Sequence, residues 1–322
     1  MLLRPTRRAF LKTAAAMPAF ALPGAQALAS LGAPEGGNPG FFRFTLGEAK
    51  ITVVSDGYLG LSVDGLGVNA DPAEVQAFLA KHFLSTETNY SHTNHIHIEI
   101  GDARVLVDVG SGNRFLETAG RVWANMEAAG LDPAAITHVV ITHAHPDHIW
   151  GIRDDFDEAI LPDAKYFIGE TEKNFWMQDG LASQVSADMQ QFVVGAQNSI
   201  EVDGAEWELM QDGTEILPGV RVIDTPGHTP GHMSVVVESG GQQLIALGDA
   251  MTHAYTNFAH PGWYNEFDMD GDQAVKTRMR LLDMVAADRM AVLGYHFPFP
   301  GVGHVMREGD TYSFVPALWK FD

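Results

Sequence analysis

Short apolar runs separated by glycine-containing turns occupy the first part of the chain after residue 40. Residues Phe41–Leu46 and 49–54 flank the Gly47-Glu48 dipeptide, and two further runs cover residues 95–100 and 104–109. Apolar runs of this length between turn residues are typical of β-strands. The pattern therefore predicts four strands here, and a fifth, buried strand at 136–141.

Helical spacing of apolar residues alternates with further strand-like runs. It covers residues 114–129, which end at Gly130, and residues 272–287, while the Phe-, Trp- and Gln-rich segment 170–200 is also predicted to be helical. Three strands are expected near 220–224, 233–238 and 243–248. Two strand-rich halves with helices outside predict an α/β protein, an αβ/βα sandwich of two mixed β-sheets.

Composition narrows the function. Of the 322 residues 46% are hydrophobic and 19% are charged, which is typical of a globular chain with a large core. The formal net charge is −21, whereas phosphate backbones require basic surfaces, so we expect no nucleic-acid partner. The chain contains no cysteine, which excludes disulfides and a cysteine nucleophile.

The first 40 residues have a separate pattern. Arg7 and Arg8 precede an apolar, alanine-rich stretch with small-residue cleavage candidates, a pattern that resembles the twin-arginine export signal of bacteria. We predict a signal peptide at 1–29, a flexible linker at 30–40 and a hydrolase domain at 41–322. The export machinery would be a partner, the location periplasmic or secreted, and the apolar stretch is too short for a stable membrane span.

The sequence His143-Ala144-His145-Pro146-Asp147-His148 follows the strand predicted at 136–141. Imidazole and carboxylate groups are the ligands that zinc-type ions prefer. Four such groups within six residues, on a tight turn at the end of a rigid strand, indicate a metal site and not a packed core histidine.

Three later strands also end in residues of ligand type. His228 lies in the turn Thr225-Pro226-Gly227-His228-Thr229-Pro230-Gly231-His232, Asp249 follows the run 244–248, and His296 follows the run 291–295. Pro and Gly force the turn that presents His228. One ligand-type residue at the end of each of three strands supports the same metal site.

Together these motifs resemble the metallo-β-lactamase superfamily from about Phe41 to the C-terminus. The segments TPGHTPGH (225–232), LLDMVAADR (281–289) and FPFPGVGH (297–304) resemble the methyl parathion hydrolase and lactonase branch more narrowly. The resemblance implies a sandwich with its metal site at the edge between the two sheets.

The resemblance also implies a set of metal ligands. His143, His145 and His228 would bind a first ion, Asp147, His148 and His296 a second, and Asp249 would bridge the two. His228 is chosen over His232 because the first His of GHTPG is the ligand in relatives. Asp147 and Asp249 would also be catalytic. We expect two zinc ions, with manganese, iron or cobalt as alternatives.

Such a centre predicts a hydrolase in which a metal-bridging hydroxide attacks the substrate. We expect a neutral, hydrophobic lactone or aryl ester, with organophosphate triesters as further substrates. A β-lactamase and an inactive metal-dependent binding protein are the alternatives. A homodimer is a further expectation, since relatives often dimerise.

Aromatic and apolar residues near these motifs are candidates for the substrate pocket. An apolar pocket would favour the neutral substrate, although each of these side chains could instead belong to the core. They are Leu59, Leu61, Trp150, Phe175, Trp176, Phe192, Phe258 and Trp263.

Other histidines and acids leave several interpretations open. His253 and His304 could orient a ligand or substrate, or simply pack. His95 and His97 share one face of a predicted strand and could form a solvated face, a packed core pair or an extra metal site. The acidic run at 268–272 is predicted to cap a helix. A calcium loop would need Glu in place of Met279.

Overall fold

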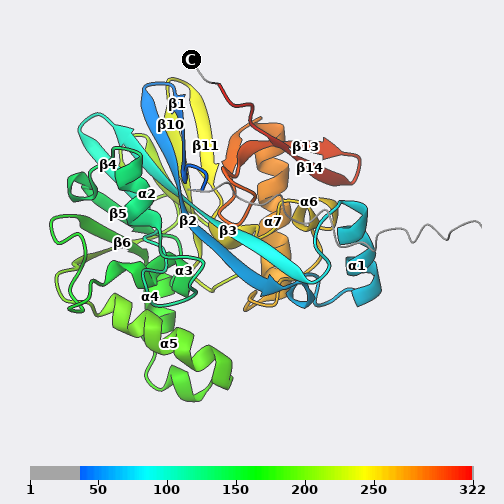
Figure 1. The fold of residues 1–322 in the computed structure, drawn as a ribbon, viewed down its shortest axis with the longest axis horizontal. Helices are drawn as coiled ribbons and strands as arrows, with labels where there is room; N and C mark the ends of the chain where they lie inside the picture. Colours follow the sequence, from blue (N-terminus) through cyan, green and yellow to red (C-terminus); the bar gives the residue numbers. More distant parts are fainter. Residues whose placement is uncertain (1–36, 321–322) are drawn as a thin grey trace, which may run out of the picture.

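The structure is a computed structural model that describes residues 37–320, and these residues form two seven-stranded mixed sheets (Figure 1). Each sheet is built from a contiguous half of the chain. The first contains, in spatial order, β1 (Phe41–Leu46), β2 (Ala49–Ser62), β3 (Thr88–Ile100), β4 (Ala103–Val107), β5 (His138–Ile141), β6 (Lys165–Gly169) and β7 (Trp207–Met210). The second contains β14 (Thr311–Pro316), β13 (Val302–Glu308), β12 (Ala291–Leu293), β11 (Gln242–Ala246), β10 (Met233–Ser239), β9 (Val220–Asp224) and β8 (Glu215–Leu217).

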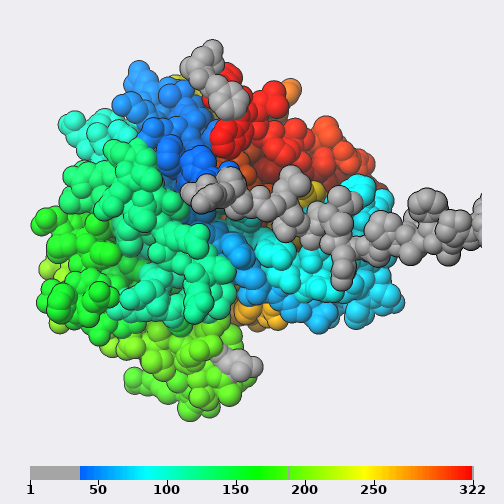
Figure 2. Space-filling view, viewed as in Figure 1, coloured from blue at the N-terminus to red at the C-terminus, as the bar shows by residue number. Residues whose placement is uncertain are grey.

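The two sheets pack face to face and helices cover their outer faces. The first sheet is covered by α2 (Val122–Ala128), α4 (Glu170–Trp176) and α5 (Ala187–Ile200), the second by α6 (Thr256–Ala259) and α7 (Gly271–Ala287). The one-turn helix α3 (Pro146–Ile149) follows β5, and α1 (Pro72–Lys81) packs beside the far end of β2. In the space-filling view the α5 region (light green) projects from the lower edge (Figure 2).

Strands that are buried on both faces place successive residues in different cores. In β5, Val139 and Ile141 pack under the helices, whereas Val140 lies between the sheets. In β10, Val235 and Val237 lie between the sheets and Val236 faces α7. This two-residue period explains why these strands read as continuous apolar runs in the sequence. The predicted αβ/βα sandwich is confirmed.

One predicted helix is largely wrong. Helical spacing covers 114–129, but only Val122–Ala128 is α-helical. The carboxylate of Asp56 accepts hydrogen bonds from the backbone of Ser111, Gly120 and Val122, and holds the preceding segment as a loop. Gly120 has φ +85°, and a Cβ there would lie 2.1 Å from the carbonyl oxygen of Gly112, so a tertiary contact overrides the local pattern.

The other predicted strands differ from the observed ones mainly in length, and the predicted helical segment 170–200 is divided into α4 and α5. β6, β7, β8, β13, β14 and α1 were not predicted from the sequence. β2 continues to Ser62 through a register shift between Ser55 and Gly57, and β3 begins at Thr88. β4 ends at Val107 because Asp108 adopts φ +58°. The predicted signal peptide and most of the linker lie outside the described residues and stay predictions. Within the described part, the helices are too short or too polar to cross a membrane.

Candidate metal centre

The loop from His143 to His148 is anchored to the neighbouring strand by Asp108. Asp108 Oδ1 accepts a hydrogen bond from the Thr142 amide (2.8 Å), and Oδ2 accepts from the Thr142 hydroxyl (2.8 Å) and faces His148 Nδ1 (2.7 Å). Asp108 directly follows β4, which pairs in parallel with β5. The carboxyl ends of these parallel strands therefore meet, and one carboxylate fixes both the start and the end of the ligand loop.

Pro146 then turns the loop into α3. His145 is the residue before the helix and Pro146 is its first residue, a position at which proline loses no helical hydrogen bond. Asp147 and His148 follow within the single turn. The phenol of Tyr295 donates to the backbone oxygen of Asp147 (2.6 Å), and its ring stacks on that of His148 at 4.0 Å.

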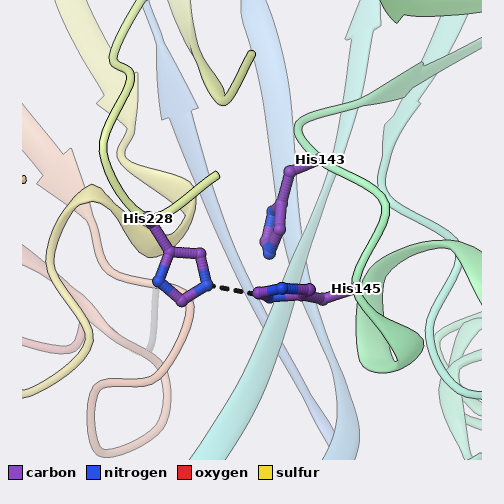
Figure 3. Close-up of side chains that lie close together, drawn as sticks. All are labelled: His143, His145 and His228. Atoms are coloured by element: carbon purple, nitrogen blue, oxygen red, sulfur yellow. Dashed lines mark hydrogen bonds between the residues drawn. The ribbon is translucent and has the colours of Figure 1, made fainter. Parts of the chain in front are cut away.

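Strand ends of the second sheet bring the remaining three residues to this loop. His228 lies in the turn after β9, Asp249 in a short 3-10 turn after β11, and His296 after β12. Figure 3 shows His143 and His145 coming from one loop and His228 from another, with their rings converging. His228 Nε2 lies 2.9 Å from His145 Nδ1.

All seven predicted residues converge in three overlapping groups whose candidate ligand atoms lie within 4.8 Å of one another. The groups are His143, His145 and His228; His143, His148 and Asp249; and Asp147, His148 and His296. Asp249 lies centrally: its Oδ2 is 3.2 Å from His228 Nε2 and 3.0 Å from His296 Nε2, and its Oδ1 is 3.3 Å from His148 Nε2.

Burial and charge make this centre suitable for cations. Each of the seven residues is at most 7% exposed. Burial lowers the pKa of His143 and His145 well below the usual value, and neighbouring histidines lower it further, so both rings are neutral. Burial would also lower the pKa of His148, but Asp147, Asp249 and Asp108 outweigh it and raise that pKa well above normal.

The pKa of Asp249 is held well below its usual value. Burial would raise it, but His296, His148 and His228 outweigh that effect. Asp249 is therefore an anion with histidines on several sides, as a bridging ligand must be.

Unpaired buried atoms show that the residues fit metal ions. His143 Nε2, Asp147 Oδ2, His148 Nε2 and Asp249 Oδ1 are buried and form no hydrogen bond. Leaving such groups unpaired is costly in free energy. Imidazole nitrogens and carboxylate oxygens facing one another are a donor set suited to zinc and similar divalent ions.

In three of the five site histidines, Nδ1 faces an oxygen of a carboxylate or of the backbone. His148 Nδ1 faces Asp108, His228 Nδ1 faces Asp268 Oδ1 (3.2 Å), and His296 Nδ1 faces the backbone oxygen of His92 (2.8 Å). These acceptors require a proton on Nδ1, so Nε2 is the nitrogen of each ring that faces Asp249 and the centre, where it could bind a cation.

Glu172, in α4, joins the two ligand loops. It is fully buried and accepts four hydrogen bonds: from the Ala144 amide (2.9 Å) and Trp176 Nε1 (2.7 Å) on Oε1, and from Thr229 Oγ1 (2.7 Å) and the Gly231 amide (3.0 Å) on Oε2. Burial raises its pKa, although all four bonds favour the ionised form. One carboxylate thus positions the His143–His145 loop against the His228 turn.

The histidines with open roles lie outside the three groups. His232 Nε2 accepts the amide of Asp249 (2.9 Å), so His232 orients Asp249 through its backbone. His253 Nδ1 accepts from the Thr256 amide (3.1 Å) at the start of α6. His304 is exposed on β13, while His95 and His97 are buried in β3. Asp270, as predicted for the acidic run, caps α7 by accepting from the Gln273 amide.

A cleft opens over the centre, and five of the seven residues line it: His145, Asp147, His228, Asp249 and His296. Of the predicted wall residues, Leu59, Leu61 and Phe192 line it. Trp176 instead packs against His145 from the core, and Trp150 packs behind Phe115. Phe175 packs against the cluster that contains Phe192 but does not line the cleft. Phe258 and Trp263 belong to hydrophobic clusters elsewhere and do not line it either.

Sequence reasoning missed several residues of the site. Phe115 and Phe267 also line the cleft, with polar groups from Asn89, Ser91, Thr252 and Asn265. Asp108 carried a signal, as an acid directly after an apolar run. Glu172 and Asp268 had no such signal in the sequence, because their contacts with the site form only in the tertiary structure.

Comparison with known proteins agrees with this geometry. Residues 91–296 match the model of the Metallo-beta-lactamase superfamily. An N-acyl homoserine lactonase of Bacillus sp is 19% identical over 53% of this chain and 60% of its own length. A probable metallo-hydrolase of Mycobacterium tuberculosis is 28% identical over 49% of this chain and 56% of its own. The chain thus spans about 60% or less of the length of these curated relatives.

Solved structures align over more of the chain. The dizinc quorum-quenching lactonase AidC, solved with a product, superposes with a TM-score of 0.77 at 23% identity, covering 87% of this chain and 98% of AidC. The hydrolase AbOPH gives a TM-score of 0.81 at 26% identity, covering 88% and 99%. By its family match, and in agreement with its fold and donor set, this chain belongs to the metallo-β-lactamase superfamily.

Proposed function

We propose that the chain is a two-metal hydrolase of neutral, apolar lactones or aryl esters. His143, His145 and His228 would hold one divalent ion, Asp147, His148 and His296 the other, and Asp249 both. The observation that carries the proposal is the convergence of seven buried ligand-type side chains, several with unpaired atoms, beneath one largely apolar cleft.

Two bound divalent ions would supply Lewis acidity towards a carbonyl or phosphoryl oxygen and would lower the pKa of water. The chain's own residues fix the arrangement. Asp108 and Glu172 hold the loop, and Asp268 and His232 orient His228 and Asp249. Zinc is our proposal for the metal, because imidazole predominates among the donors.

The cleft supports the neutral substrate. Its walls carry Leu59, Leu61, Phe115, Phe192 and Phe267, and among the described residues that line it the only acids are the proposed ligands Asp147 and Asp249. Apolar walls with a few polar groups are typical of small-molecule sites. The aromatic rings also suit an aryl leaving group, which favours aryl phosphotriesters as a second substrate class.

The test is a substrate panel assayed with protein of known metal content. It should contain an aryl ester, an aliphatic lactone, methyl parathion and a β-lactam, with Asp249→Ala as the inactive control. We expect turnover of the ester or lactone that a chelator abolishes and metal restores. Turnover of the β-lactam alone, or of no compound with two ions bound, would contradict the proposal.

A further inference from the structure

A second cavity lies beside the cleft, on the other side of His296. It is bounded by the end of α1, the start of β3 and the segment before α6, and Asn89 and His296 border both spaces. In Figure 1 the long strands β2 and β3 extend beyond the rest of the first sheet to reach α1 and α6. None of the residues assigned to the metal centre, apart from His296, borders this cavity.

The two spaces share one floor. Leu59 and Leu61 of β2 line the cleft, and Val63, two residues further on, lines the second cavity. Ser62 between them is extended (φ −69°, ψ 142°), so the alternation of faces continues. On β3, Ser91 pairs with Leu59 and Asn89 with Leu61. The segment from Leu59 to Val63 is roughly 13 Å long and leads from the metal centre into the second cavity.

The cavity suits an uncharged, apolar occupant. Within residues 37–320, its lining contains no Asp, Glu, Lys or Arg, and much of it is aliphatic, including Val63, Leu66, Leu79 and Leu84. Burial lowers the pKa of His253, which lines it, to about 4, so this imidazole is neutral near pH 7.

Exposed aromatic side chains among the lining residues indicate where an occupant would lie. Phe83 is 70% exposed, Tyr90 47% and Tyr255 39%. Phe83 also has φ +59°, a conformation that is uncommon for a bulky residue. The backbone conformation of Phe83 costs free energy and leaves its ring in solvent. An apolar ligand that covers the ring would explain both features.

We infer that this cavity binds an apolar chain of the substrate. The scissile ester or lactone lies over the metal cluster, and an uncharged alkyl chain passes Asn89 and follows the β2–β3 floor towards Phe83. The inference rests on the proposed function and narrows it to substrates with a medium-length or longer acyl chain.

The test uses p-nitrophenyl esters from acetate to decanoate and the metal-loaded full chain. In the parent, kcat/KM should rise with chain length, by up to roughly fourfold for each methylene that becomes buried. Leu84→Trp, which fills the cavity, should lower kcat/KM for decanoate at least tenfold and leave acetate unchanged. Phe83→Asn removes an exposed ring, tolerates the positive φ and should weaken only the long esters. Leu209→Trp, on exposed β7, is the matched control and should change neither.

Binding of 1-octanol, measured by calorimetry, separates this inference from the proposed function. Octanol has no ester or lactone bond to hydrolyse, and it should bind the parent and Leu209→Trp but not Leu84→Trp. If no ester or lactone is turned over, the proposed function fails while octanol binding still tests the cavity. Equal losses for acetate and decanoate in Leu84→Trp, or equal octanol affinity in parent and Leu84→Trp, would overturn the inference.

Discussion

The two halves of the molecule deliver ligand-type residues in different ways. The first half places His143, His145, Asp147 and His148 on one loop, whose anchor Asp108 contacts both its ends. The second half delivers His228, Asp249 and His296 from three strand ends, each with its own orienting partner. A local motif thus depends on a shared anchor, whereas the dispersed set is held one residue at a time. Substitutions should therefore affect several ligands in the first half and one in the second.

Asp249→Ala should have the largest effect, because Asp249 approaches histidines from both halves. We expect turnover to fall by more than the roughly 10–100-fold that is typical when a residue hydrogen-bonded to a metal ligand is replaced. The variant should also retain fewer than two ions. Metal analysis after dialysis, together with ester turnover, measures both. Retention of two ions at parental affinity would show that Asp249 does not bridge.

Asp108→Asn should come next. An amide NH₂ facing His148 Nδ1 would move the ring proton to Nε2 and remove the lone pair that a cation needs. Metal affinity should fall by nearly 100-fold, roughly the upper end of the range for residues that orient a ligand, and Thr142 should become less ordered. Metal titration by calorimetry tests this expectation. An unchanged affinity would refute the shared-anchor interpretation of the first half.

Glu172→Gln tests the connection between the halves. Four donors face two carboxylate oxygens, so an amide NH₂ must leave at least one buried donor without an acceptor. We expect a loss of about 1–3 kcal/mol in the free energy of unfolding. The loss of metal affinity should lie between those of Asp108→Asn and Asp268→Asn. Urea unfolding and metal titration measure these effects. Glu170→Gln, on the same helix with an exposed partner, is the control, and equal behaviour of the two variants would contradict the role of Glu172.

Asp268→Asn should have the smallest effect on the centre, because Asp268 contacts only His228 among the seven residues. Metal affinity should fall by roughly tenfold, the lower end of the range for outer partners. The buried ion pair with Arg278 (3.5 Å) would also weaken. A loss greater than that of Asp108→Asn, in the same titration, would reverse the order expected from the comparison.

His97 provides a pH test in the first sheet, away from the ligands. Burial lowers its pKa to about 4, with opposing smaller effects of Glu99 and Arg104. The folded chain then holds a neutral ring where the unfolded chain takes up a proton below about pH 6.5. Its contribution to stability is complete above pH 6.5 and is lost as pH falls towards 4, roughly 3 kcal/mol in all. His97→Leu should flatten this slope in metal-free urea unfolding, and parallel curves would contradict the assignment.

Much of the fold could be predicted because its signals are local. Apolar runs marked β9, β10 and β11 nearly to the residue, and the six-residue motif placed four ligand-type residues on one loop. Asp249 and His296 were found for the same reason, since each ends an apolar run. The family resemblance supplied the pairing of the halves.

What escaped prediction depends on contacts distant in sequence. Asp268 lies 40 residues from His228, and Glu172 lies 28 residues from Ala144. The helix predicted at 114–129 is mostly absent, although the segment has helical spacing, because backbone amides just before and within it donate to Asp56. The same error hid Phe115 as a wall residue of the cleft. Local pattern identifies candidate ligands, whereas their orienting partners require the tertiary structure.

The central claim is that both halves together build one two-ion hydrolytic centre. Its most direct test is to strip the protein with a chelator, titrate zinc back and follow aryl ester turnover against ions bound per chain. We predict no turnover in the stripped protein and full turnover at two ions per chain. Activity that survives stripping, or that is complete with one ion, would contradict the claim.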